Sequence, residues 1–112
     1  ALVRTLPQAQ PVLFCDDASP DAEVRALLEG LPQRVPFAAR VLRRERNLGF
    51  VGNVNAAFDE CAERDVVLLN SDTVPGAGWL QRLQACLASD PRIATATPWS
   101  NNAEICSLPD LC

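Results

Sequence analysis

The sequence predicts an α/β fold, a three-layer sandwich in which helices cover both faces of a mostly parallel sheet. Short apolar runs alternate with amphipathic segments along the chain, which is the order typical of βαβ units. The run at 12–15 is apolar throughout, as in a strand that is covered on both faces. This run and the one at 66–69 are followed by acids, and ligands of open α/β sheets bind beyond the carboxyl ends of strands. We therefore expect one domain, residues 1–112, with a site at that edge of the sheet.

Each predicted element rests on apolar spacing or on residues that begin and end helices. Apolar residues at helical spacing predict helices, and continuous apolar runs predict strands. Ser19, Pro20 and Asp21 signal the start of a helix, and Gly30 is expected to end it. The predicted order is a helix tail ending near residue 10, then a strand at 12–15, a helix at 22–29, a strand at 40–43, a helix at 51–61, a strand at 65–70, a turn at 75–78, a helix at 79–88 and a strand at 93–97.

The predicted core combines the strands with apolar helix faces and cysteines. Cys15, Cys61 and Cys86 occupy positions typical of core residues, which indicates buried thiols in a reducing compartment. No C-x-x-C pair occurs, so a zinc site is not expected, and the roles of Cys106 and Cys112 stay open. The inward helix residues are predicted to be Val51, Val54, Ala57, Phe58 and Cys61, and then Leu80, Leu83 and Leu87.

Charge and residue types exclude several kinds of chemistry. The net charge of −4 argues against nucleic acid or an anionic membrane as the primary partner. All ten basic residues are Arg, so these residues offer no Schiff-base lysine, P-loop lysine or imidazole base. No signal peptide is evident, and no apolar run approaches the roughly 20 residues that span a bilayer. We expect a cytoplasmic protein.

Four motifs in order resemble the family 2 glycosyltransferases, which have the Rossmann-like GT-A fold. They are DDASPD at 16–21, NLGF with a further Asn at 47–55, LNSDT at 69–73 and PG-x-x-WL at 75–80. The segment PWSNNA at 98–103 is similar to a rhamnosyltransferase-like branch of that family. The resemblance covers residues 12–109, and it implies an enzyme that moves a sugar from a nucleoside diphosphate to a hydroxyl group.

The resemblance assigns roles to the acids. Asp16 matches the residue that hydrogen-bonds the nucleotide base, a pyrimidine, and Asp17 and Ser19 line the same turn. Asn70, Ser71 and Asp72 occupy the place of the family's D-x-D motif. Asp72, supported by Asn70, would hold a divalent cation, Mn²⁺ or Mg²⁺, which neutralises the donor diphosphate. The alternative is that these acids only form turns or cap helices.

The NLGF segment also belongs to the implied nucleotide-sugar site, through Asn47, Gly49, Phe50 and Asn55. Gly49 permits a backbone conformation closed to other residues, and the two asparagines can tie the loop by side-chain hydrogen bonds. The helix that follows has an N-terminus that favours anions. A structural turn with Phe50 in the core is an alternative compatible with this role.

Four aromatic or polar residues belong to the C-terminal motifs. Trp79 is expected to pack rather than to stack on a sugar. Ser100, Asn101 and Asn102 could face the donor sugar or form a capped turn.

The resemblance also implies what lies outside the chain. The family's opening strand and its acceptor half, which carries the catalytic base, have no counterpart here, so the chain is expected to be a donor-binding piece that is inactive alone. The parent enzyme would transfer a sugar from a UDP- or dTDP-sugar to a carbohydrate or lipid-linked acceptor, with inversion at the anomeric carbon. The parent could lie at the inner face of a membrane. An incomplete sheet exposes edges, so we expect a homodimer or a rearranged sheet.

A signalling module is the competing hypothesis. Receiver (CheY-like) domains have similar size and also place paired acids after an apolar strand, as in 12–17. However, Asn70 stands where the phosphoacceptor Asp would be, and the chain has no Lys to contact a phosphoryl group. A pseudo-receiver without catalysis and a non-catalytic α/β scaffold therefore stay as alternatives.

Overall fold

The computed structural model describes residues 2–6 and 10–101. The chain divides into two compact units, Leu2–Thr73 and Val74–Cys112, and each is described by itself. The single domain expected over residues 1–112 stays a prediction.

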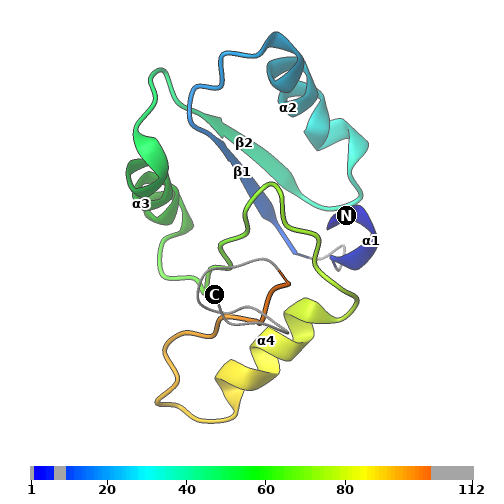
Figure 1. Cartoon of the computed structure of the whole chain (residues 1–112), viewed down its shortest axis with the longest axis vertical. Coiled ribbons are helices and arrows are strands. Elements are labelled where there is room, and N and C mark those ends of the chain that lie inside the picture. Colours follow the sequence, from blue (N-terminus) through cyan, green and yellow to red (C-terminus); the bar gives the residue numbers. More distant parts are fainter. Residues whose placement is uncertain (1, 7–9, 102–112) are drawn as a thin grey trace. The chain divides into compact units, whose positions relative to one another are not determined.

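The first unit contains a parallel pair of strands between helices. Its elements are α1 (Leu2–Thr5), β1 (Val12–Asp16), α2 (Ala22–Arg34), β2 (Ala39–Arg43) and α3 (Gly49–Cys61). The strands run parallel in a register that pairs Val12 with Ala39 and Asp16 with Arg43. Helix α2 packs against β2 and α3 against β1, and Figure 1 shows the two helices on opposite sides of the strand pair. The predicted α/β fold with a parallel sheet is thus confirmed.

Helix α2 is longer than predicted. Asp21 caps its beginning by accepting a hydrogen bond from the Glu23 N–H at 2.7 Å. Gly30 was expected to end it, but the helix continues through Pro32 to Arg34. It ends at Val35, which is extended (φ −108°, ψ 147°), because the following Pro36 disfavours the helical conformation of the residue before it.

Two predicted strands are absent from the part of the chain that the structure describes. Residues 65–70 and 93–97 have no regular secondary structure. Val66, Val67 and Leu68 are 41–53% exposed, although their apolar run was expected to be a buried strand. A strand requires a hydrogen-bonding neighbour, and among the described residues the sheet consists of β1 and β2 alone. Local propensity without a partner strand therefore leaves the run irregular and exposed.

The core differs in detail from the predicted one. Phe37 is the most buried apolar residue of the first unit. On α3, Val54, Ala57 and Cys61 are half-buried as expected of an inward face, whereas Val51 and Phe58 are exposed. Phe50 is 65% exposed, so the interpretation that places it in the core is wrong. Cys15 and Cys61 are half-buried and Cys86 is exposed, so the expectation of buried thiols fails for Cys86.

The second unit contains α4 (Trp79–Ala88), at the bounds that the sequence predicts. Leu80 is buried, and Leu83 and Leu87 are half-buried, which confirms the predicted inward face. Gly78 precedes the helix with φ +69°, a conformation that favours glycine. No helix among the residues described in either unit has the length and apolar character needed to cross a membrane.

Candidate functional site

The turn between β1 and α2 carries the first group of predicted site residues. Asp16 ends β1, and only 2% of its side chain is exposed. Its Oδ1 accepts a hydrogen bond from the Ser19 N–H at 3.0 Å, and its Oδ2 accepts one from Arg43 Nη1 at 2.5 Å. Both carboxylate oxygens are therefore engaged by the protein.

Arg43 connects the end of β2 to the same turn. Its Nη2 donates to the Ser19 carbonyl at 2.8 Å while Nη1 holds Asp16. The next residue, Arg44, donates its backbone N–H to the Asp16 carbonyl at 2.9 Å. We call the contacts of Arg43 with Asp16 and Ser19 the Asp16–Arg43 clamp. The clamp holds the turn at its first residue, Asp16, and at its last residue, Ser19.

The clamp also determines the charge of Asp16. Burial raises the pKa of the Asp16 carboxyl, but the hydrogen bonds from Ser19 and the positive charges of Arg43 and Arg25 outweigh it, so the pKa lies below its ordinary value. Asp16 is therefore ionised at neutral pH and can only accept hydrogen bonds.

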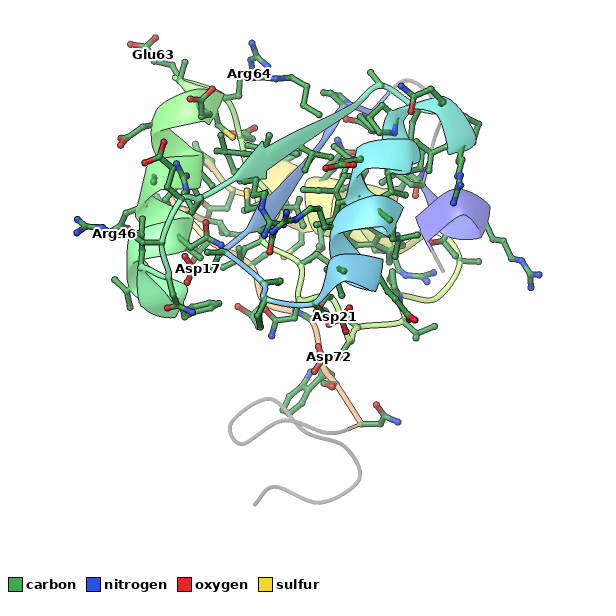
Figure 2. All side chains as sticks on the ribbon, turned by 90° about the horizontal axis from the view of Figure 1, so that it is seen from above. Asp17, Asp21, Arg46, Glu63, Arg64 and Asp72 are labelled. Atoms are coloured by element: carbon green, nitrogen blue, oxygen red, sulfur yellow. The ribbon has the colours of Figure 1, made fainter. Side chains whose placement is uncertain are left out.

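Asp17 lies next in the turn and is more exposed than Asp16. Its Oδ1 accepts a hydrogen bond from the Leu48 N–H at 2.8 Å, which ties the turn to the loop between β2 and α3. Figure 2 shows Asp17 where β1 ends, beside the beginning of α3. Between Asp17 and Ser19, Ala18 has φ +60°, which is unfavourable for a residue with a Cβ atom. Contacts with the surrounding structure must therefore hold this turn in place.

The loop from β2 to α3 forms the second wall of the site. Arg43, Arg44, Glu45, Arg46 and Leu48 line an open depression. Asn47 Oδ1 accepts a hydrogen bond from the Gly49 N–H at 2.9 Å, so the tie predicted for Asn47 is present. The structure gives no such bond for Asn55 among the described residues. Gly49 has φ +70°, as its predicted role requires, and α3 begins without a side-chain cap.

Asn53 joins this loop to β1 from within α3. Its Oδ1 accepts a hydrogen bond from Arg44 Nε at 3.3 Å, and its Nδ2 donates to the Cys15 carbonyl at 3.4 Å. Arg44 Nη2 is buried without a partner among the described residues. Burial raises the pKa of the Cys15 thiol beside this contact, although the charge of Arg44 lowers it in part. Asn55, which the resemblance assigned to the site, lies exposed on the same helix.

The segment that matches the D-x-D motif is an exposed turn. Asn70, Ser71 and Asp72 are all exposed, and the Thr73 N–H donates to the Asn70 carbonyl at 3.1 Å. In Figure 2, Asp72 lies toward the same end of the first unit as Asp17 and Asp21, whereas Glu63 and Arg64 lie at the other end. The structure thus brings the two predicted groups of acids to one end of the unit.

Metal binding can be judged from the donor atoms of this turn. Among the described residues no group of three or more His, Cys, Asp or Glu side chains could hold a metal ion. Asp72 and Asn70 supply one carboxylate and one amide oxygen. Mg²⁺ is commonly held by one or two carboxylates together with water and substrate phosphates, so this donor set fits a cation that arrives with a diphosphate.

The C-terminal candidates lie in the second unit. Trp79 is half-buried, with its indole N–H buried and unpartnered among the described residues, so its burial fits the expected packing role. Trp99 is 61% exposed, Ser100 is half-buried and Asn101 is exposed. Asn102, Cys106 and Cys112 lie outside the described residues.

The family assignment rests on a comparison with protein families. The model of Glycosyl transferase family 2 matches residues 3–105 of the chain. The chain belongs to glycosyl transferase family 2. No curated protein and no solved structure matches it. Membership of this family associates the chain with glycosyl transfer from nucleotide sugars, while the rhamnosyltransferase-like branch stays a prediction.

Sequence reasoning missed three residues that connect these segments: Arg43, Arg44 and Asn53. The signal for Arg43 was available in part, because Asp16 directly follows one predicted strand and Arg43 ends another, and the two are neighbours in the parallel pair. The roles of Arg44 and Asn53 depend on where α3 docks against β1, and no local pattern of residues encodes that.

Proposed function

We propose that the first unit of this family 2 chain binds the nucleotide of a sugar donor, UDP- or dTDP-linked, together with a divalent cation. The observation that supports this best is the fixed turn at the end of β1, which Arg43 and Leu48 hold from two other segments of the unit. A binding site benefits from such preorganisation because the ligand does not have to order it.

In this proposal the base lies against the 16–19 turn and the 47–50 loop. The resemblance assigns the contact with the base to Asp16, but only 2% of that side chain is exposed. We therefore propose that Asp16 organises the turn and that Asp17, whose Oδ2 has no hydrogen bond among the described residues, offers the carboxylate oxygen to the ligand. Ser19 and Asn47 support the two segments, and Gly49, Phe50 and Asn55 line the loop side.

The diphosphate and the cation lie at the exposed 70–72 turn in this proposal. Asp72 and Asn70 hold Mg²⁺ or Mn²⁺, with Ser71 beside them. When bound, the cation neutralises the leaving diphosphate as the sugar–phosphate bond breaks. The parent activity is transfer, with inversion, to a hydroxyl of a carbohydrate or lipid-linked acceptor, and its catalytic base is expected from outside this chain. A cytoplasmic location, a homodimer and inactivity of the isolated chain complete the proposal.

Calorimetric titration of the folded chain with UDP and dTDP, in Mg²⁺ and then in EDTA, tests the proposal. We expect saturable binding that weakens about tenfold or more in EDTA and in Asp72→Ala, which corresponds to about 1.4 kcal/mol. Asp65→Ala is the matched control, because Asp65 is also exposed and lies outside the proposed site, and it should bind like the unmodified chain. Absence of nucleotide binding in a folded sample would overturn the proposal.

A further inference from the structure

Arg43 is placed to hold the 16–19 turn of the proposed nucleotide site. It reaches from the end of β2 to two groups of the 16–19 turn, the Asp16 carboxylate at 2.5 Å and the Ser19 carbonyl at 2.8 Å. Its side chain is 31% exposed, whereas that of Asp16 is 2% exposed. Arg40 on the same strand offers a contrast, because its ion pair with Glu60 is exposed on both sides and ties no turn.

The turn that Arg43 holds is conformationally unfavourable. Ala18, between the two groups that the clamp binds, has φ +60°, where a Cβ atom approaches the neighbouring carbonyl. Residues in such conformations persist only where the surrounding structure enforces them. The Ser19 N–H bond to Asp16 is local to the turn, and backbone N–H groups of Arg44 and Leu48 bond to Asp16 and Asp17 from outside it. Arg43 supplies the side-chain contacts that join Asp16 and Ser19, on either side of Ala18, to β2.

We propose that Arg43 is a positioning residue of the nucleotide site: by clamping Asp16 and the Ser19 carbonyl, it holds the 16–19 turn in the conformation that presents Asp17 to the ligand. The expected effect of Arg43 on nucleotide affinity rests on the proposed function. The structural half of the proposal, that Arg43 helps to maintain the geometry at Ala18, rests on these two contacts and does not depend on the proposed function.

The consequence for variants is specific. Arg43→Met removes both contacts, so the turn should relax at Ala18 and Asp17 should lose its bond to Leu48. Arg43→Lys keeps the charge and one donor direction but cannot bridge two acceptors as a planar guanidinium does, so its effect should be intermediate. Ala18→Gly should compensate for the loss of Arg43, because glycine adopts positive φ without the steric penalty.

The chain offers a matched control for this compensation. Ala62 also has positive φ, +54°, and it follows the C-terminal end of α3, whereas the Asp17–Leu48 bond lies at the N-terminal end of that helix. The helix has 13 residues, so its two ends are about 20 Å apart. Ala62→Gly also relieves a positive φ in the same unit, so it tests for general stabilisation without acting on the turn.

The experiment measures UDP affinity in Mg²⁺ and amide hydrogen exchange at Ser19 and Leu48 for these variants. We expect Arg43→Met to weaken UDP about tenfold and to speed exchange at both amides about tenfold, with Arg43→Lys between it and the unmodified chain. Ala18→Gly added to Arg43→Met should recover about half of the lost UDP affinity on a logarithmic scale, whereas Ala62→Gly added to it should recover none. Arg40→Met alone should change neither UDP affinity nor amide exchange.

The two readouts separate failure of this inference from failure of the proposed function. A folded chain that binds no UDP overturns the proposed function and the affinity consequence, and the exchange rates still decide whether Arg43 holds the turn. Normal UDP binding and normal exchange in Arg43→Met overturn the positioning role. Equal recovery by Ala18→Gly and Ala62→Gly also overturns it, because Arg43 would then contribute only general stability.

Discussion

Replacing Asp16 with Asn tests whether the Asp16–Arg43 clamp contributes substantially to the stability of the first unit. The substitution keeps the size of the side chain and lets the Asn oxygen accept from the Ser19 N–H, but it removes the charge and turns an N–H donor toward Arg43 Nη1. Breaking a fully buried ion pair by removing one partner costs about 3–5 kcal/mol. Arg43 is 31% exposed and water can hydrate it, so we expect a smaller loss of about 2 kcal/mol.

The assay must report on the first unit alone. Both tryptophans, Trp79 and Trp99, lie in the second unit, so their fluorescence does not follow the strand pair. Amide hydrogen exchange at Phe14 and Leu42, whose N–H groups point across the β1–β2 ladder, does follow it. A loss of about 2 kcal/mol corresponds to about thirtyfold faster exchange at neutral pH. A change of less than about threefold would refute the reasoning, because the clamp would then contribute no more than an exposed ion pair.

The pH dependence of this difference follows from the lowered pKa of Asp16. A carboxyl whose pKa is lower in the folded state stabilises fully above its unfolded pKa of about 3.9. That stability is lost as the pH falls through the folded-state pKa, where the carboxylate becomes protonated. The difference in the free energy of unfolding between the unmodified chain and Asp16→Asn should therefore be the same at neutral and mildly acidic pH. It should become smaller below about pH 4. A gap that closes between pH 7 and pH 5 would contradict the direction of the pKa shift.

Three further predictions concern helix glycines, the second unit and the exposed 70–72 turn. Gly30→Ala should stabilise α2 by about 0.5–1 kcal/mol in denaturant titrations followed by circular dichroism, because the added Cβ meets only the flexible end of Arg34. Gly49→Ala should destabilise the first unit although its Cβ would meet open space, because Gly49 has φ +70°; equal effects at the two glycines would contradict both predictions. Leu80→Ala should cost about 2–5 kcal/mol in a tryptophan-monitored titration, and a cost under about 1 kcal/mol would show that Leu80 is not a core residue. Asp72→Ala should leave stability unchanged in the same titrations, because its side chain is exposed, and a marked loss would assign it a structural role.

The elements with strong local signals could be predicted from the sequence. The apolar run at β1, the start of α2 at Asp21 and the whole of α4 follow from spacing and capping residues, which act within a few neighbouring positions. The end of α2 differs from the prediction because the Val35–Pro36 pair, and not Gly30, ends the helix: proline sterically disfavours the helical conformation of the residue before it. Gly30 needs no positive φ and so is compatible with a continuous helix.

The strand predicted at 65–70 and the partner of Asp16 could not be predicted for a different reason, because both depend on residues far away in the sequence. The run at 66–68 has strand propensity but pairs with nothing among the described residues, so its apolar side chains stay exposed. The importance of Asp16 could be predicted, since an acid that ends a strand is conspicuous. Its partner Arg43 lies 27 residues away, and only the register of β1 against β2 brings the two together.

The proposed function claims that the nucleotide binds at the 16–19 turn and the 47–49 loop. Amide chemical shifts report directly on such binding. The measurement is a titration of the ¹⁵N-labelled chain with UDP in Mg²⁺, followed at every assigned backbone amide. We predict saturable shifts at Ser19, Leu48 and Gly49 and none at Glu63 and Arg64, which Figure 2 places at the other end of the unit. Saturable shifts confined to Glu63 and Arg64, or no shift at any amide with UDP in large excess, would contradict the claim.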